Sequence, residues 1–251
     1  MDSRWFFLLR AYAASAARNF ASLASGGVPC VVCGAAAVGI PVCAACRRSF
    51  FSVPEPDSSF CRGCGMRLVS ERGTCTLCRK NAPAGSADGL YPLFPYRLWC
   101  ARLVCRWKLH GKRSLSPFFA SLVDARLAQL FLKFGDCTVV PVPPRPGKIR
   151  RAGWDQVAEL CAFLKWRHGR TVGEYLLRRT KAEQKALDRS QRLSSIGKSY
   201  VLKPGLEQVP RRLCLVDDVM TTGATIEGCA AALKSRGAET VLAVPLFSVD
   251  S

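Results

Sequence analysis

The sequence predicts an α/β fold in which a mainly parallel sheet carries helices on both faces and follows a small cysteine-rich segment. Three observations lead to this prediction. Short β-prone runs alternate with helical patterns after residue 90, eight cysteines form regular pairs before residue 80, and one apolar run ends in two acids and a Thr-Gly turn. Strands that alternate with helices are the order that builds parallel sheets. The 251 residues are enough for one large domain or two small ones.

Residues 1–27 form a predicted amphipathic helix that ends at a pair of glycines, with apolar residues at helical spacing. A secretory signal is disfavoured, because the apolar run starts after Asp2 and stops at Arg10. Arg10 and Arg18 also interrupt the only run that approaches the length of a membrane span, so no transmembrane segment is expected. This helix is expected to pack on the protein itself, and docking on a membrane surface is the alternative.

Fourteen cysteines are present, and eight of them form four C-x-x-C pairs between residues 28 and 80. The pairs are Cys30/Cys33, Cys43/Cys46, Cys61/Cys64 and Cys75/Cys78. Two intervening residues let one tight turn aim both thiolates at a single tetrahedral metal ion. Regular pairs in a chain of this length favour metal sites over disulfides, and therefore a reducing, cytoplasmic location.

The cysteine-rich segment is a repeat whose second copy follows the first by 31 or 32 positions. Gly34 and Gly65 follow the first pair of each copy, where a turn with positive φ lets backbone N–H groups point at the sulfurs. A duplicated unit should be self-sufficient, which predicts one zinc ion per copy and leaves interleaved pairing as the alternative. The two predicted ligand sets are Cys30, Cys33, Cys43 and Cys46, and Cys61, Cys64, Cys75 and Cys78.

Four protein ligands leave no position for a catalytic water, so both zinc ions are predicted to be structural. The other six cysteines lack the paired spacing and are expected to be small buried hydrophobes. These are Cys100, Cys105, Cys137, Cys161, Cys214 and Cys229.

Small, turn-rich residues at 81–89 predict a boundary between a double zinc ribbon at 28–80 and a second domain at 90–251. In the second domain, strands are expected at 90–96, 138–142, 213–216 and 240–247. Helical patterns separate them at 97–110, 117–133, 154–168 and 224–236. This order predicts a ligand site at the carboxyl ends of parallel strands.

The most informative stretch runs from Leu213 to Thr225, where an apolar strand leads into Asp217-Asp218 and a turn rich in hydroxyls opens a helix. Consecutive backbone N–H groups at a helix start bind phosphate well. Adjacent carboxylates can accept hydrogen bonds from vicinal hydroxyls, and a phosphate with a diol describes a sugar phosphate. The alternative, a capped helix with surface acids, explains Thr225 or Asp218 alone but not the whole run.

These thirteen residues resemble the signature loop of type I phosphoribosyltransferases, which bind 5-phosphoribosyl 1-diphosphate. The resemblance implies that Asp217 and Asp218 hold the ribose hydroxyls at the catalytic centre. It assigns the 5-phosphate to Thr221, Thr222, Gly223, Ala224 and Thr225. It also implies Mg²⁺ on the diphosphate, which leaves while a nitrogen nucleophile attacks a cationic ribosyl centre.

Nearly the whole chain resembles the ComF family, competence-associated proteins that join zinc ribbons to a phosphoribosyltransferase-like domain. Beyond the ribbons and the signature loop, the resemblance rests on Tyr96 through Lys108, Val140-Pro141-Val142-Pro143, Gly153-Trp154-Asp155-Gln156, and Arg178-Arg179-Thr180 with Gln184, Leu187 and Arg192. It implies that Lys108 approaches the diphosphate and that residues 178–192 form a mobile loop over the site. Ala152 and Ser195 depart from the family pattern, in which arginine and asparagine are usual.

The chain carries 37 Lys and Arg against 18 Asp and Glu, a net charge of +19 that favours polyanionic partners. Six cations and no acid lie at 97–113, and residues 145–212 have a net charge of +11. This exceeds what one sugar diphosphate requires and suggests single-stranded DNA, with tryptophans as stacking faces. The alternative is a solvated basic surface with the tryptophans packed inside. The four candidates are Trp99, Trp107, Trp154 and Trp166.

Three functions compete. The favoured one, implied by the family, is a protein that binds phosphoribosyl diphosphate with Mg²⁺ and acts as an accessory factor in uptake of single-stranded DNA during natural transformation. It would be cytoplasmic and peripheral to the inner membrane, where it would meet the DNA-uptake machinery. The second is an active phosphoribosyltransferase of nucleotide metabolism that releases diphosphate to an unidentified nitrogen nucleophile. The third is a zinc-ribbon scaffold for a partner protein.

Overall fold

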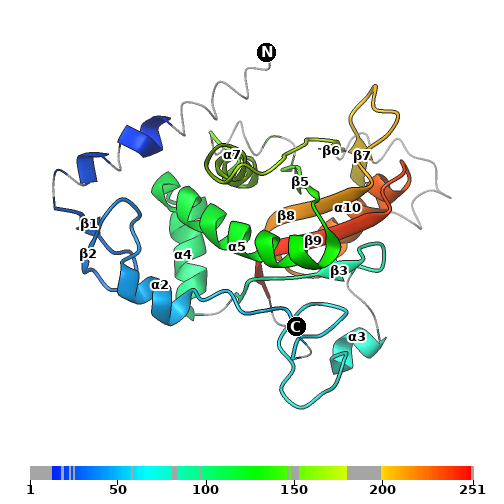
Figure 1. Ribbon diagram of the computed structural model, residues 1–251, viewed down its shortest axis with the longest axis horizontal. Coiled ribbons are helices and arrows are strands. Elements are labelled where there is room, and N and C mark those ends of the chain that lie inside the picture. Colours follow the sequence, from blue (N-terminus) through cyan, green and yellow to red (C-terminus); the bar gives the residue numbers. More distant parts are fainter. Residues whose placement is uncertain are drawn as a thin grey trace.

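The structure is a computed structural model that describes residues 13–17, 20–22, 24, 26–57, 59–80, 84–96, 98–145, 147, 153–179 and 199–249. Figure 1 shows a twisted sheet with helices on both sides and two cysteine-rich ribbons at its periphery. Most of the loop expected at 178–192 lies outside the described residues, and so do Ala152 and Ser195.

The sheet is parallel throughout, with strand order β3-β9-β8-β5 and with β4 pairing β9 beside β3. Its members are β3 (Gly89–Leu90), β4 (Phe94–Pro95), β5 (Thr138–Pro141), β8 (Arg212–Met220) and β9 (Thr240–Ser248). The two central strands, β8 and β9, are each nine residues long and apolar along most of their length. Strands buried on both faces read as continuous apolar runs, which explains their composition.

Successive residues of the central strands face two separate cores. Cys214 and Val216 pack with residues of three helices on one face, α4 (Leu98–Lys108), α5 (Ser116–Phe134) and α7 (Gln156–His168). Leu213 and Leu215 pack with α10 (Ala224–Lys234) on the other face. This alternation follows from the two-residue period of a strand. The predicted fold class, a parallel sheet with helices on both faces, is confirmed.

The strand prediction needed three corrections. The strand expected at 213–216 continues to Met220 because the long neighbour β9 pairs with it as far as Met220 and Ser248. The strand expected at 90–96 is broken into β3 and β4. A short antiparallel hairpin, β6 (Leu176–Arg178) with β7 (Tyr200–Leu202), was not predicted, because its strands are three residues long and far apart in sequence.

The first ribbon shares the core of the α/β domain. It contains β1 (Val28–Pro29), β2 (Ala36–Ala37) and α2 (Ala44–Phe50), and its buried residues belong to the same apolar cluster as α4 and α5. Phe51, which follows α2, meets Phe118 of α5 edge to face, with ring centroids 4.8 Å apart. The first zinc site is therefore continuous with the domain interior.

The second ribbon, which contains α3 (Thr76–Lys80), forms the lobe at the bottom of Figure 1. None of its described residues belongs to either apolar core cluster. It approaches the sheet edge through Gly65, where a Cβ atom would lie 2.2 Å from the carbonyl oxygen of Leu90 and 2.4 Å from Cδ of Pro92. Only glycine permits this approach, and the φ of +70° at Gly65 also favours glycine.

Gly65 and its counterpart Gly34 give a matched pair of substitutions. Gly34 has a φ of +80° and nothing within 4 Å of its Cβ position, so Gly34→Ala is expected to cost about 1 kcal/mol from backbone strain alone. Gly65→Ala must in addition displace the ribbon from Leu90, and we expect it to cost about 3 kcal/mol. Urea denaturation of both variants with zinc in excess measures the difference. Equal losses would show that the close approach at Gly65 contributes nothing.

The described residues between 13 and 24 are helical, in agreement with the predicted N-terminal helix, whose first twelve residues lie outside the description. A different helical span, Arg113–Phe134, is long and apolar enough to cross a membrane by length and composition alone. The sequence analysis did not consider it. Because 61% of its most apolar window is buried inside the structure and α5 packs on α7 and β9, this span is placed as a core helix.

Candidate functional site

The structure gathers the eight paired cysteines into two clusters, each made of the four neighbours in one copy of the repeat. Within each cluster the four Sγ atoms lie within 4.8 Å of one another. Sγ of Cys33 is 3.7 Å from Sγ of Cys43, and the equivalent distance from Cys64 to Cys75 is 3.9 Å. Two sulfurs on a tetrahedral zinc ion lie about 3.8 Å apart when each Zn–S bond is about 2.3 Å. Both clusters therefore fit zinc, in the adjacent rather than the interleaved arrangement.

Backbone N–H groups face the first sulfur of each copy. The N–H of Cys43 donates to Sγ of Cys30 at 3.3 Å, and the N–H of Cys75 donates to Sγ of Cys61 at 3.2 Å. Burial raises the pKa of the Cys30 thiol, but these backbone donors outweigh it and lower the pKa to about 6. The same balance lowers the pKa of Cys61 to about 7. Because the thiolate is the form that ligates zinc, the backbone prepares one ligand in each cluster.

A cavity of about 490 Å³ opens at the carboxyl ends of four strands. Its lining includes Tyr96 after β4, Val142 after β5, Asp218 in β8 and Val249 after β9. Because parallel strands end at the same edge of a sheet, this is the position expected for the ligand. Two larger cavities, of about 770 and 660 Å³, lie at the second ribbon. Chemistry rather than size favours the cavity at the strand ends.

Asp217 and Asp218 both line this cavity and lie within β8. Asp218 is almost fully buried, and its Oδ2 atom is 2.7 Å from Nζ of Lys108 at the end of α4. Oδ1 of Asp217 accepts the backbone N–H of Asp218 at 2.8 Å. The structure therefore brings together the two acids and the lysine, which the sequence analysis assigned to the ribose and the diphosphate.

The predicted phosphate turn follows β8 directly. Thr221 and Thr225 line the cavity, whereas Thr222, Gly223 and Ala224 form the turn between them and are not among the lining residues. Gly223 precedes the first residue of α10 with a φ of +75°, a conformation that requires glycine. Oγ1 of Thr222 accepts the N–H of Ala224 at 3.5 Å. The turn thus places two hydroxyls and the N-terminus of α10 beside the acids.

Four further polar residues line the cavity: Arg145, Asp155, Arg178 and Tyr200. The Tyr200 hydroxyl donates to Oγ1 of Thr225 at 3.3 Å, and the guanidinium of Arg178 lies 5.2 Å from the Tyr200 ring centroid. The sequence analysis noted Asp155 and Arg178 only as family matches and missed Tyr200. No local pattern marks Tyr200, because the β6–β7 hairpin brings it to the site.

The residues present fit a magnesium ion that arrives with a phosphorylated ligand. Mg²⁺ prefers oxygen donors and usually takes one or two carboxylates together with phosphate oxygens. Asp217 and Asp218 supply such carboxylates at the cavity, and Asp218 already has a cationic neighbour in Lys108. Asp217 is therefore the better placed of the two for an ion.

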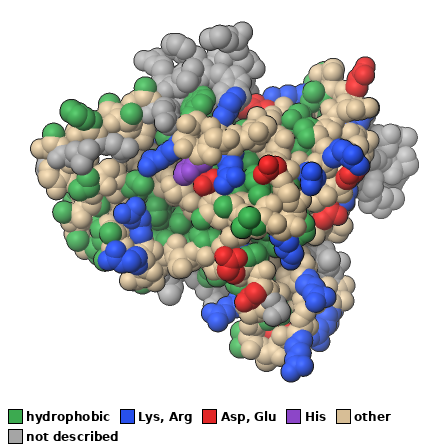
Figure 2. Space-filling view, viewed as in Figure 1, with side chains coloured by type: hydrophobic (Ala, Val, Ile, Leu, Met, Phe, Trp, Pro, Cys, Tyr) green, Lys and Arg blue, Asp and Glu red, His purple; other side chains and the backbone are tan. Residues whose placement is uncertain are grey.

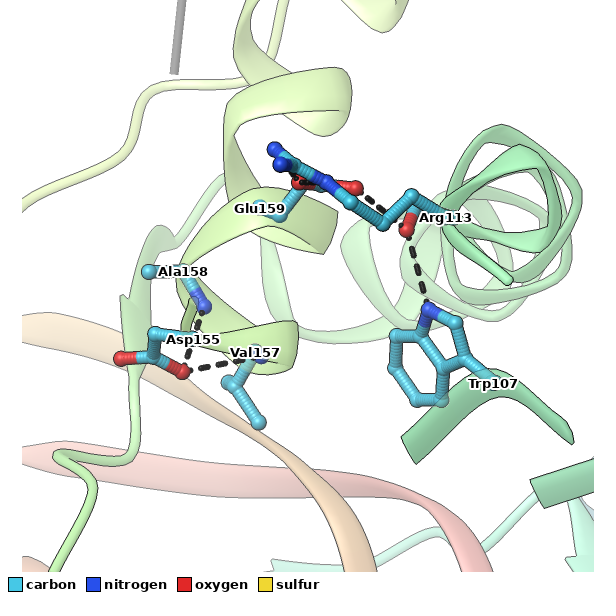
Figure 3. A network of polar contacts seen from close by, with 7 residues as sticks. Trp107, Arg113, Asp155, Val157, Ala158 and Glu159 are labelled. Carbon is cyan, nitrogen blue, oxygen red and sulfur yellow. Dashed lines mark hydrogen bonds and ion pairs between the residues drawn. The ribbon is translucent and has the colours of Figure 1, made fainter. Parts of the chain in front are cut away.

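A buried polar network holds the site from behind, as Figure 3 shows. Glu159 of α7 is almost fully buried and accepts hydrogen bonds from the Arg113 guanidinium and from the Ser116 hydroxyl at 2.7 Å each. The hydroxyl of Ser116 in turn accepts Nε1–H of Trp107 at 2.9 Å. Trp107 precedes Lys108, and Glu159 lies one turn after Asp155, so the network fixes two cavity residues relative to each other.

The tryptophans are not the stacking faces considered above. Trp107 is fully buried and Trp154 is 8% exposed, and their rings meet edge to face. Trp166 is half-buried, and the side chain of Trp99 lies outside the description. Burial follows from the shared core of α4, α5 and α7. Among the unpaired cysteines, Cys105 is half-buried and the other five are buried, as expected.

Two zinc-type clusters beside a parallel sheet with a polar cavity at its strand ends define a class: a zinc-ribbon protein with a phosphoribosyltransferase-like α/β domain. The relatives below place it more closely. No family model matches the chain. Three relatives are each 26% identical to it and align with 80% of its residues.

These relatives are the competence protein ComFC of Streptococcus pneumoniae, competence protein F of Haemophilus influenzae and the DNA utilization protein YhgH of Escherichia coli. The alignment covers 84% of the first relative and 87% of each of the other two. The resemblance to the ComF family is thereby confirmed. Among solved structures, a Trypanosoma cruzi hypoxanthine phosphoribosyl transferase is similar with a TM-score of 0.32 and 16% identity, over 53% of this chain and 64% of that one.

Proposed function

We propose that this protein binds 5-phosphoribosyl 1-diphosphate with Mg²⁺ at the strand-end cavity and acts as an accessory factor in uptake of single-stranded DNA. The single observation that carries the proposal is the meeting of Asp217, Asp218 and Lys108 with the Thr221–Thr225 turn in one cavity. The names of the relatives, competence and DNA utilization proteins, support the role in DNA uptake. Such a role would place the protein in the cytoplasm, at the inner face of the membrane.

The charges of the cavity suit an elongated anion with a neutral sugar in its middle. The hydroxyls of Thr221 and Thr225 and the start of α10 would hold the 5-phosphate, and the carboxylates would accept the ribose hydroxyls. Lys108 and Arg145 would face the diphosphate, whose charge Mg²⁺ neutralises when bound. Because Lys108 contacts Asp218, the lysine would have to share or exchange that partner when the diphosphate enters.

Lys108→Gln tests this assignment. It removes one charge-assisted contact to the diphosphate, so we expect the affinity for the sugar donor to fall about tenfold, or about 1.4 kcal/mol. Lys203→Gln is a matched control, since Lys203 pairs with Glu174 outside the cavity lining. Fluorescence or calorimetric titration with the donor and Mg²⁺ measures both. Equal affinities of the two variants would remove Lys108 from the proposed site.

A second candidate function is transfer of the ribosyl group, and the position of the two acids favours it. Carboxylates beside the ribose would stabilise the positive charge that develops as the diphosphate departs. Release of diphosphate from the donor, lost in both Asp217→Asn and Asp218→Asn, would establish an enzyme. If the donor binds but no diphosphate appears with any offered nitrogen nucleophile, the site is a sensor rather than a catalyst.

The DNA role needs a separate test, because the two functions use different surfaces. Arg106 is a poor probe, since its guanidinium donates to the carbonyl of Val31 and so holds the first ribbon. Arg102 and Lys112 are exposed. We expect binding of single-stranded DNA to weaken steeply with salt and to lose strength in Arg102→Gln/Lys112→Gln but not in Asp217→Asn. Binding that is absent at low salt would contradict the role.

A further inference from the structure

Arg126 of α5 is a buried cation that lacks partners. Its side chain is 1% exposed, and neither Nε nor Nη1 has a hydrogen-bond partner among the described residues. Arginine keeps its proton under all ordinary conditions, so the positive charge persists despite burial. Leaving a guanidinium out of water without an anion is strongly unfavourable. The fold tolerates this residue where an apolar side chain of similar length would fill the same space.

The neighbours of Arg126 do not neutralise it. The closest acidic influence is Glu55, an exposed residue whose Oε1 accepts from the Gln129 amide at 3.0 Å. No ion pair within 4 Å involves Arg126 in the described part of the chain. Burial lowers the pKa of Arg126, which agrees with a cation that has no close counter-ion.

Arg126 lies in the lining of the largest cavity, about 770 Å³, between the second ribbon and the edge of the sheet. Three other cations share that lining: Arg62, Arg72 and Lys133. Of its three acids, Asp88 is paired with Lys234 and also accepts the N–H of Val241. Asp57 accepts two bonds from Ser59, and Glu71 accepts one from Thr76. The acids are thus engaged locally, whereas the deepest cation is not.

The walls of this cavity come from two parts of the chain that meet at Gly65. The ribbon supplies Arg62 and Arg72, whereas α5 supplies Arg126 and Lys133. In Figure 2 the ribbon is the lower lobe, and basic side chains are visible on its described surface. A ligand bound here would contact both parts at once and would hold the ribbon against the sheet.

We propose that this cavity is a second anion site, which binds the terminal phosphate of a small molecule with Arg126 as its innermost cation. A terminal phosphate carries up to two charges and three free oxygens, which suit the unfilled N–H groups of Arg126 and the surplus of cations around it. The volume accommodates a molecule of nucleotide size. A phosphate inside a nucleic-acid backbone is flanked by sugars on both sides and would not reach a guanidinium buried to this depth.

Calorimetric titration of the full, zinc-loaded chain with inorganic phosphate, and then with adenosine 5′-monophosphate, tests the site. Arg126→Met keeps the length of the side chain and removes the charge, and we expect it to weaken this binding by at least tenfold. Without phosphate the unfolding midpoint of Arg126→Met should equal or exceed that of the unmodified chain, because an unpaired buried charge is gone. A large fall in the midpoint, or unchanged phosphate affinity, would overturn the proposal.

A pair of exposed arginines gives an independent arm that does not disturb the interior. Arg72 lines the cavity, whereas Arg67 lies on the same ribbon outside that lining. Arg72→Gln is expected to weaken phosphate binding three- to tenfold, and Arg67→Gln should leave it unchanged. Thr225→Val removes phosphate binding at the strand ends and should keep the binding that depends on Arg126. Equal effects of the two arginine variants, or binding of acetate as strong as that of phosphate, would refute the site.

Discussion

Substitution of Cys30 or Cys61 by serine is expected to release one zinc ion and to remove on the order of 10 kcal/mol of folding free energy from the ribbon concerned. The ribbons depend on the metal because they are short and have little apolar core of their own. Metal content, measured by elemental analysis, should fall from two zinc ions per chain to one in either variant. Cys105→Ser, outside both clusters, is the control and should keep both ions.

The two variants should nevertheless differ in how far the damage spreads. Cys30 belongs to the apolar cluster that contains α4 and α5, so its loss should lower the melting temperature of the whole α/β domain. Cys61 belongs to neither core cluster, and its loss should expose only the second ribbon to protease. Identical melting curves for Cys30→Ser and Cys61→Ser would contradict this placement of the ribbons.

Glu159→Ala is the other change with a large expected effect, about 3 kcal/mol of the free energy of unfolding. It leaves the buried hydroxyl of Ser116 and the Arg113 guanidinium without their acceptor. Because the network also fixes Trp107 beside Lys108, we expect weaker binding of the sugar donor as well as lower stability. Chemical denaturation and donor titration measure the two effects.

The control for Glu159→Ala is Glu239→Ala. Glu239 forms an exposed ion pair with Arg211, and exposed pairs contribute at most about 1 kcal/mol. A loss at Glu159 no greater than that at Glu239 would mean that the buried network does not hold the site. A large loss of stability with unchanged donor affinity would confine its role to the fold.

Much of the fold and of the site could be predicted from local patterns. The zinc ligands follow from the two-residue spacing within pairs and from the repeat, since a turn of that length presents two sulfurs to one ion. The cavity acids and the phosphate turn were predictable because one unbroken stretch, Leu213 to Thr225, carries them both. The sheet order followed from the alternation of strands with helices.

What could not be predicted depends on contacts between distant segments. Tyr200 reaches the cavity through a hairpin whose strands are separated by more than twenty residues. The end of β8 is set by the length of β9, which no pattern within β8 reveals. Phe51 and the first ribbon join the domain core, although a linker seemed to divide the two parts. Composition also places an arginine such as Arg126 at the surface, where most arginines lie.

Isothermal titration of the zinc-loaded chain with 5-phosphoribosyl 1-diphosphate and Mg²⁺ is the most direct measurement of the strand-end site. We predict one donor bound per chain, with binding that requires Mg²⁺ and is lost in the double variant Asp217→Asn/Asp218→Asn but kept in Glu239→Gln. Absence of binding to the unmodified chain, or binding that survives the double variant, would contradict the assignment of this cavity to a phosphorylated ribose.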